Sequence, residues 1–183
     1  QKAIQFFQEQ LIISQELGDF NEICSLLANL GDAYAVSGNI DRAKSYYEEQ
    51  LTLAELKGLN VFVGSSYNGL GHVFVKKEKI PEAIDCYLKA LENYRELEDH
   101  EKQLELLVGI GLNHYKLEQW EKTTEYLLPA LDAAKYLENR KEEVQILIDL
   151  AESYEKLGKK ELVKSHLDQA EDRLNITDEN WGS

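Results

Sequence analysis

The chain repeats itself every forty residues, and this period is the feature that most limits its possible folds. One column of the repeat is small in every copy: Gly31, Gly71, Gly111 and Ala151. A large aliphatic residue precedes each of them. A small residue between large ones lets two helices approach closely while the large side chains fill the space beside them. The period therefore predicts stacked helical hairpins.

Three more columns follow the same period. They are Ala43, Ala83, Thr123 and Val163; Tyr47, Tyr87, Leu127 and Leu167; and Gln50, Ala90, Ala130 and Ala170. The spacing of these columns resembles the tetratricopeptide repeat (TPR), a helix–turn–helix unit of about 34 residues. The segments NLGDAY and GLGHVF carry the resemblance best. The longer period is similar to TPR variants in bacterial arrays, kinesin light chains and spindle-orientation adaptors.

The resemblance implies an all-α fold, a right-handed α-solenoid of antiparallel TPR hairpins with about nine helices. We expect a half repeat at residues 1–20, which makes the chain a fragment of a longer array, and a frayed tail at 175–183. The full repeats are predicted at 21–60, 61–100, 101–140 and 141–174. First helices are predicted near 21–37, 61–77, 101–117 and 141–157. Second helices are predicted near 1–17, 40–57, 80–97, 121–137 and 160–174.

Residues that end and begin helices support these limits. Glycines fall where a helix is expected to end in a left-handed residue: Gly18, Gly38, Gly58 and Gly158. Asn21, Asn39 and Asn60 are predicted to cap the helices that follow. Pro129 lies in the middle of a predicted helix and predicts a kink there, either a change of superhelical pitch or a tolerated local bend.

Charge and hydropathy exclude several kinds of partner. Lys and Arg total 20 against 34 Asp and Glu, a net charge of −14 that repels phosphate backbones. The longest apolar stretch, 106–112, is far shorter than the roughly 20 residues that span a bilayer. No signal-peptide pattern opens the chain. We expect a cytoplasmic protein with no nucleic-acid or membrane partner.

The sequence holds no recognisable catalytic or metal-binding arrangement. No two of the four histidines are three or four residues apart, and His114, which stands in a tyrosine column, is interpreted as a packing residue. Cys24 and Cys86 are predicted to be buried free thiols. The adjacent pairs Glu48-Glu49 and Glu142-Glu143 are predicted to be solvated. We therefore expect no enzyme activity, cofactor or metal.

In stacked TPR hairpins, one stripe of each first helix lines a concave groove where partners bind. The candidate partner-binding residues, here called the first-helix stripe, are Asn29, Asp32, Asn68, His72, Val75, Lys76, Val108, Leu112, Tyr115, Lys116, Ile148, Glu152 and Lys156. Asn29 matches the asparagine that holds an extended peptide in spindle-orientation adaptors and kinesin light chains. The chaperone-type carboxylate clamp is absent.

Two parts of the stripe have alternative interpretations. Its apolar members either form an anchor pocket for a partner side chain or are covered by neighbouring first helices: Val75, Val108, Leu112, Tyr115 and Ile148. Lys76, Lys116 and Lys156 either complement the dipoles of their helices or form a ladder for an acidic partner.

The favoured function is a non-catalytic protein-interaction scaffold that binds a partner peptide or helix in the concave groove. One alternative is the regulatory or sensor region of a larger enzyme, such as a caspase-like peptidase. Another is structural self-association. In the half repeat, Ile4, Phe7 and Leu11 are expected to be uncovered, which predicts weak association through that helix.

Overall fold

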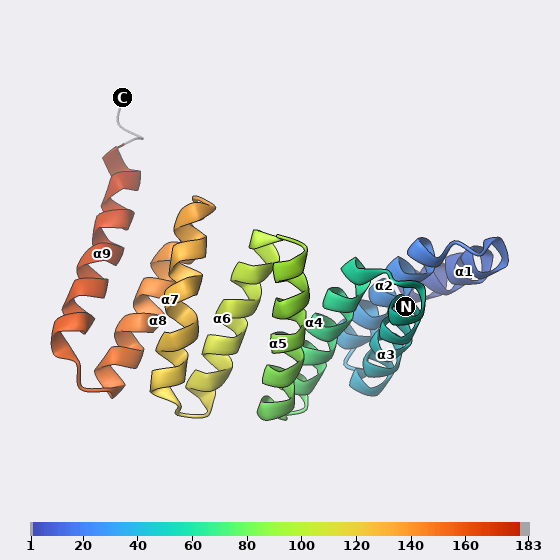
Figure 1. The fold of residues 1–183 in the computed structure, drawn as a ribbon, viewed down its shortest axis with the longest axis horizontal. Coiled ribbons are helices and arrows are strands. Elements are labelled where there is room, and N and C mark those ends of the chain that lie inside the picture. The colour runs from blue at the N-terminus through green and yellow to red at the C-terminus, as the bar shows by residue number, and fades with distance from the viewer. Residues whose placement is uncertain (1, 180–183) are drawn as a thin grey trace. The chain divides into compact units, whose positions relative to one another are not determined.

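The computed structural model describes residues 2–179, with side chains up to residue 174. This part of the chain forms an all-α helical repeat array (Figure 1). Its helices are α1 (Lys2–Leu17), α2 (Phe20–Val36), α3 (Ile40–Lys57), α4 (Asn60–Lys76), α5 (Ile80–Glu96), α6 (His100–Lys116), α7 (Trp120–Tyr136), α8 (Arg140–Lys156) and α9 (Lys160–Glu179). First helices recur every forty residues, which confirms the hairpin period.

The helix limits differ from the predicted ones by small amounts. Each first helix begins one residue earlier than predicted. Asn39 caps α3 as expected, by accepting a hydrogen bond from the backbone N–H of Arg42. Asn21 and Asn60 do not cap, because they already lie inside α2 and α4. The side chains that cap first helices are Asp19, Asp99 and Asn139.

The last helix is longer than predicted, since α9 runs to Glu179 and not to residue 174. The first five residues of the predicted tail are therefore helical, and 180–183 lie outside the described residues. Helix α7 continues through Pro129 without a break. The kink at Pro129 stays a prediction.

The backbone turns left-handed at one position every twenty residues. Four of these positions hold the predicted glycines, with φ between 66° and 83° at Gly18, Gly38, Gly58 and Gly158. The others hold glutamate, with φ between 54° and 59° at Glu78, Glu98, Glu118 and Glu138. The left-handed turn is therefore a property of the repeat, and glycine occupies only half of these turn positions.

The chain divides into two compact units, residues 1–98 and 99–183. In unit 1 the core includes Leu30, Tyr34, Tyr47 and Leu70, with both cysteine thiols buried and free as predicted. A Cβ added at Gly31 would lie 2.6 Å from the Tyr47 ring, and one at Gly71 would collide with the Tyr87 ring. The small column is therefore the close-approach column that the sequence indicated.

The exposed face of α1 differs from the predicted one. Ile4, Phe7 and Leu11 are half-buried, because their spacing of three and four residues turns them toward α2 and the core cluster. The large apolar side chains that α1 leaves exposed are Phe6, Ile12, Ile13 and Leu17.

In unit 2 the fully buried side chains include Leu106, Ile110, Leu127 and Ile146. His114 is buried, stacks on the Tyr126 ring at 5.4 Å and hydrogen-bonds through Nδ1 to Gln119 Oε1 at 2.8 Å, which confirms its packing role. Glu143 was predicted to be solvated and is buried. Its carboxylate accepts a hydrogen bond from Arg173 Nε at 2.8 Å. Adjacent helical residues point about 100° apart, so Glu143 can face α9 while Glu142 does not.

Candidate functional site

The unit 1 part of the first-helix stripe carries two side chains that bind their own hairpin. Asp32 on α2 accepts a hydrogen bond from the Tyr47 hydroxyl on α3. His72 on α4, forty residues later, bonds through Nδ1 to the Tyr87 hydroxyl on α5 at 3.0 Å. Burial, and then Asp32, raises the pKa of Tyr47. Asp32 and His72 thus help hold the hairpins together, in addition to any role in binding.

Sequence reasoning missed this role, although the sequence contains its signal. Each polar residue directly follows the close-approach glycine, and each tyrosine stands fifteen residues further along. In unit 2 the same two positions hold Leu112 with Leu127, and Glu152 with Leu167. Because Leu127 and Leu167 have no hydroxyl group, no such bond ties Leu112 or Glu152 to the second helix.

The unit 2 part of the stripe is a cluster on α6 and α8. The Tyr115 ring lies edge-on to Trp120, with ring centroids 4.9 Å apart, and its hydroxyl bonds Glu152 Oε2 at 3.5 Å. Partial burial, and then Glu152, raises the pKa of Tyr115. This hydroxyl contact brings the α6 and α8 stripes together. Trp120 was not among the predicted site residues.

The apolar residues of the stripe differ in how far neighbouring helices cover them. Leu112 is 38% exposed, whereas Val108, Tyr115 and Ile148 are half-buried. Neighbouring helices therefore cover these side chains only partly. Val75, also half-buried, belongs to unit 1. Val108, Leu112 and Tyr115 share one face of α6 by their spacing, and Ile148 lies one turn before Glu152 on α8, so these four unit 2 residues form the candidate cluster.

The remaining stripe residues are polar and lie along the first helices. Asn29 is exposed on α2 and Asn68 is half-buried on α4. Lys76, Lys116 and Lys156 are all exposed and each lies in the last turn of its helix. None of these three ammonium groups pairs with a carboxylate of the described residues. Their position fits the negative end of the helix dipole.

Among residues 2–174 no three His, Cys, Asp or Glu side chains gather in a way that could hold a metal ion. The histidines have protein partners: His100 packs against Tyr136, and His166 Nδ1 lies 2.8 Å from the carbonyl oxygen of Leu162. None of the described helices is both long enough and apolar enough to cross a bilayer.

The tetratricopeptide repeat family matches residues 25–55 and 62–122, which together make up about half of the chain. These ranges contain the NLGDAY and GLGHVF segments and both Tyr47 and Tyr87. The chain belongs to the tetratricopeptide repeat family. No curated protein sequence matches this TPR array.

Solved structures share the fold of the TPR array. BtubC (BKLC) from P. vanneervenii aligns with a TM-score of 0.88 at 22% identity, over 97% of this chain and 74% of that one. A STAND protein with a tetratricopeptide repeat sensor, from Pyrococcus horikoshii, gives 0.75 at 24% identity, over 92% of this chain and 29% of that one. A putative kinesin light chain of P. anserina gives 0.75 at 15% identity, over 97% and 88%.

Proposed function

We propose that the TPR array is a non-catalytic protein-interaction scaffold that binds a partner peptide or helix on the first-helix stripe. Stacked helical repeats offer a broad, preformed surface, and binding needs no reacting groups on it. The observation that supports this best is the unit 2 cluster, where Leu112 is 38% exposed beside Tyr115, Val108 and Ile148. Apolar side chains gathered within a polar rim are typical of a docking site.

Tyr115 is the expected anchor of this surface. Its ring is oriented by the edge contact with Trp120, and its hydroxyl is held near Glu152. A side chain that is already ordered loses little conformational freedom when a partner packs on it. Aromatic anchors of this kind carry much of the energy of protein interfaces. Glu152, Lys116 and Lys156 supply polar contacts on the same helices.

Peptides selected from a random library against the chain test the proposal. Tyr115→Ala should weaken the binding of a selected peptide by about 2 kcal/mol, roughly thirtyfold in Kd, measured by fluorescence anisotropy. Leu112→Asp should weaken it further, because it puts a charge into the apolar contact.

Leu88→Asp is the matched control, since Leu88 is also 38% exposed but lies on the second helix α5. It should leave the affinity unchanged. Equal affinity of the parent and a folded Leu112→Asp, Tyr115→Ala variant would place the binding surface elsewhere.

A second candidate function is a sensor or regulatory region of a larger enzyme. The observation that favours it is the likeness to the STAND protein, of whose length this TPR array covers 29%. In that case partner binding on the stripe would alter an activity encoded elsewhere in the same gene. A complete reading frame without a catalytic domain would eliminate this candidate.

Structural self-association remains a third candidate, now on a different face of α1. Phe6 is 57% exposed and Ile13 is 48% exposed, and seven residues place them on the same side of the helix. Sedimentation velocity at increasing concentration, with Phe6→Glu as the comparison, decides whether this face associates.

A further inference from the structure

An apolar groove lies in unit 1, away from the first-helix stripe. Its volume is about 570 Å³, and it is formed by the end of α1, the start of α2 and the second half of α3. Ile23 is buried at its floor and Leu53 is half-buried. Phe20 and Leu56 line it as well and remain 39% and 75% exposed. This volume lies within the range of protein sites that take a ligand or an anchoring side chain.

The repeat itself does not require this apolar lining. Three periods further along the chain, Arg140, Glu143 and Arg173 stand at the positions of Phe20, Ile23 and Leu53. There the lining is polar, and Arg173 Nε pairs with Oε1 of the buried Glu143 at 2.8 Å. The fold thus accepts an ion pair at these positions. Of the two places compared, only the one near Phe20 has an apolar lining.

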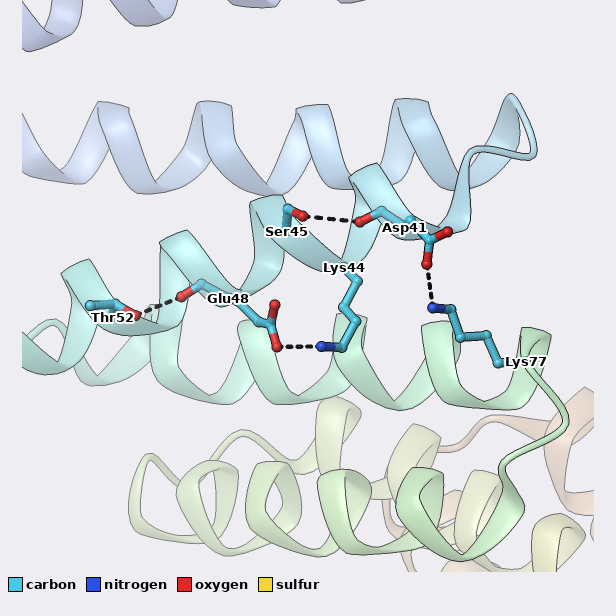
Figure 2. Close-up of polar contacts among 6 residues, drawn as sticks. All are labelled: Asp41, Lys44, Ser45, Glu48, Thr52 and Lys77. Carbon is cyan, nitrogen blue, oxygen red and sulfur yellow. Dashed lines mark hydrogen bonds and ion pairs between the residues drawn. The ribbon is translucent and has the colours of Figure 1, made fainter.

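The edge of the groove is acidic. Glu48 and Glu49 line it from α3. Figure 2 shows that the Glu48 carboxylate pairs with Lys44 at 2.6 Å, while its backbone carbonyl accepts a hydrogen bond from the Thr52 hydroxyl. Glu49 is exposed and makes no hydrogen bond or ion pair with the described residues. One carboxylate at the edge is therefore available to a cation from outside.

The aromatic ring that lines the groove also interacts with a cation of the chain itself. Lys57 Nζ lies 3.8 Å from the centroid of the Phe20 ring. An ammonium or guanidinium group over an aromatic face is attracted by the negative potential of the ring. The net charge of −14 also draws basic partners toward the chain and repels acidic ones.

We propose that this groove, lined by Phe20, Ile23, Leu53 and Leu56 and edged by Glu48 and Glu49, is a second docking site that takes a basic amphipathic peptide segment. An aliphatic side chain of the partner enters the apolar groove. A lysine or arginine next to it in the partner pairs with Glu49. This site shares no residue with the first-helix stripe, so each can fail without the other.

Three synthetic peptides test the chemistry of the site. The first has leucines spaced four residues apart between lysines and carries a fluorescent label. The second replaces the lysines by glutamates, and the third replaces the leucines by serines. Binding to the 183-residue chain, followed by anisotropy, is expected for the first peptide and not for the other two. Glu49→Gln should weaken it at low salt and have little effect at high salt, where exposed charges are screened.

Variants that keep the charge of the chain separate the groove from general attraction to an acidic protein. Leu56→Ser and Phe20→Asn should each weaken the first peptide about tenfold or more, because they remove apolar contact and leave every carboxylate in place. Asparagine already stands one period after Phe20, as Asn60, so this variant should fold. Thermal melting checks that it does.

The matched control is Tyr136→Ser, because Tyr136 holds the Leu56 position in the third full repeat and is 72% exposed. The Tyr136→Ser variant should bind the first peptide with the same affinity as the parent. Equal binding of the serine peptide, or parent-like affinity in folded Leu56→Ser and Phe20→Asn, would overturn the proposal. So would self-association of the chain that Leu56→Ser abolishes while the basic peptide fails to bind, since the occupant would then be a second copy.

Discussion

At the residue scale, four glutamates occupy turn positions that favour glycine. Glu78, Glu98, Glu118 and Glu138 have φ between 54° and 59°. A non-glycine residue in this region carries a steric cost of about 1–2 kcal/mol between Cβ and the following carbonyl. The helices on either side fix the backbone at each of these residues, so the steric cost lowers the stability of the folded protein.

Glu118→Gly should raise the free energy of unfolding by roughly 0.5–1 kcal/mol. Glycine removes the steric cost at φ 57°, although its greater freedom in the unfolded chain offsets part of the gain. Urea denaturation of the variant and the parent measures the difference. Glu121→Gly, in the first turn of α7, is the control and should lower stability. A Glu118→Gly protein no more stable than its parent would contradict the steric argument.

Asp149 is a second residue whose side chain is in an unfavourable environment in the folded protein. Burial raises its pKa above the ordinary 3.8, and Glu152 and Glu142 add to this, although a hydrogen bond from Gln145 at 2.9 Å opposes it. A carboxyl whose pKa is raised on folding favours the folded state below its ordinary pKa. That contribution is lost as the pH rises through the raised value. At neutral pH the charged form is therefore unfavourable.

Asp149→Asn should be more stable than the parent at pH 7, because the amide keeps an oxygen for Gln145 and carries no charge. Asparagine already stands at this repeat position in Asn29. The advantage should shrink as the pH falls and vanish below about 3.8, where the parent carboxyl is neutral in both states. Thermal melts across this range provide the measurement. An advantage that does not change with pH would point to packing as its cause.

At the element scale, the close-approach column decides how paired helices pack. Gly71 on α4 faces the Tyr87 ring of α5, and Gly69 faces the Tyr47 ring of α3. Helix α4 thus meets a tyrosine on each side at a position without a side chain. The absence of a side chain at these positions lets the large rings approach the backbone of the neighbouring helix closely.

Gly71→Leu should destabilise the protein by about 1–3 kcal/mol or more, because the new side chain must displace the Tyr87 ring. Circular dichroism during thermal unfolding measures the loss. Val61→Leu is the control on the same helix, since Val61 is 59% exposed and has room for a larger side chain. Unchanged melting of Gly71→Leu would mean that α4 and α5 do not pack through this column.

The sequence predicted the elements well where a column recurs in every repeat. The Gly31 and Tyr47 columns predicted the hairpins, and the helix limits followed within a residue at most ends. It failed where a residue depends on a partner far along the chain. Glu143 is thirty residues from Arg173, and no local pattern shows that its carboxylate is buried. The left-handed turns at the four glutamates were also missed, because glutamate carries no signal for such a turn.

The candidate site was predictable to a smaller extent. Helical spacing indicated the stripe, of which Leu112 is exposed while Tyr115 and Ile148 are half-buried. The binding role of these residues stays a prediction. The hydrogen bonds of Asp32 and His72 to the tyrosine column were not predicted, because they depend on which helix face meets the next helix. The repeat pattern also does not show that Val75 belongs to unit 1 while the other apolar residues of the stripe belong to unit 2.

At the scale of the whole molecule, negative charges outnumber positive ones. The chain carries 34 Asp and Glu against 20 Lys and Arg. The ion pairs of the described residues are mostly on the surface, as between Lys89 and Asp85 or Lys102 and Glu105. Exposed pairs of this kind contribute little, so repulsion among the remaining carboxylates opposes the folded state.

Added salt should therefore stabilise the protein at neutral pH. Raising the ionic strength from about 0.01 M to about 1 M shortens the screening length from roughly 30 Å to roughly 3 Å, which removes most of the repulsion between exposed carboxylates. The melting temperature should rise steeply at the low end and level off, as screening does. The same titration close to the isoelectric point is the control, because few net charges remain to be screened there. A melting temperature that stays constant with salt at neutral pH, or the same rise at both pH values, would show that self-repulsion does not limit the stability of this array.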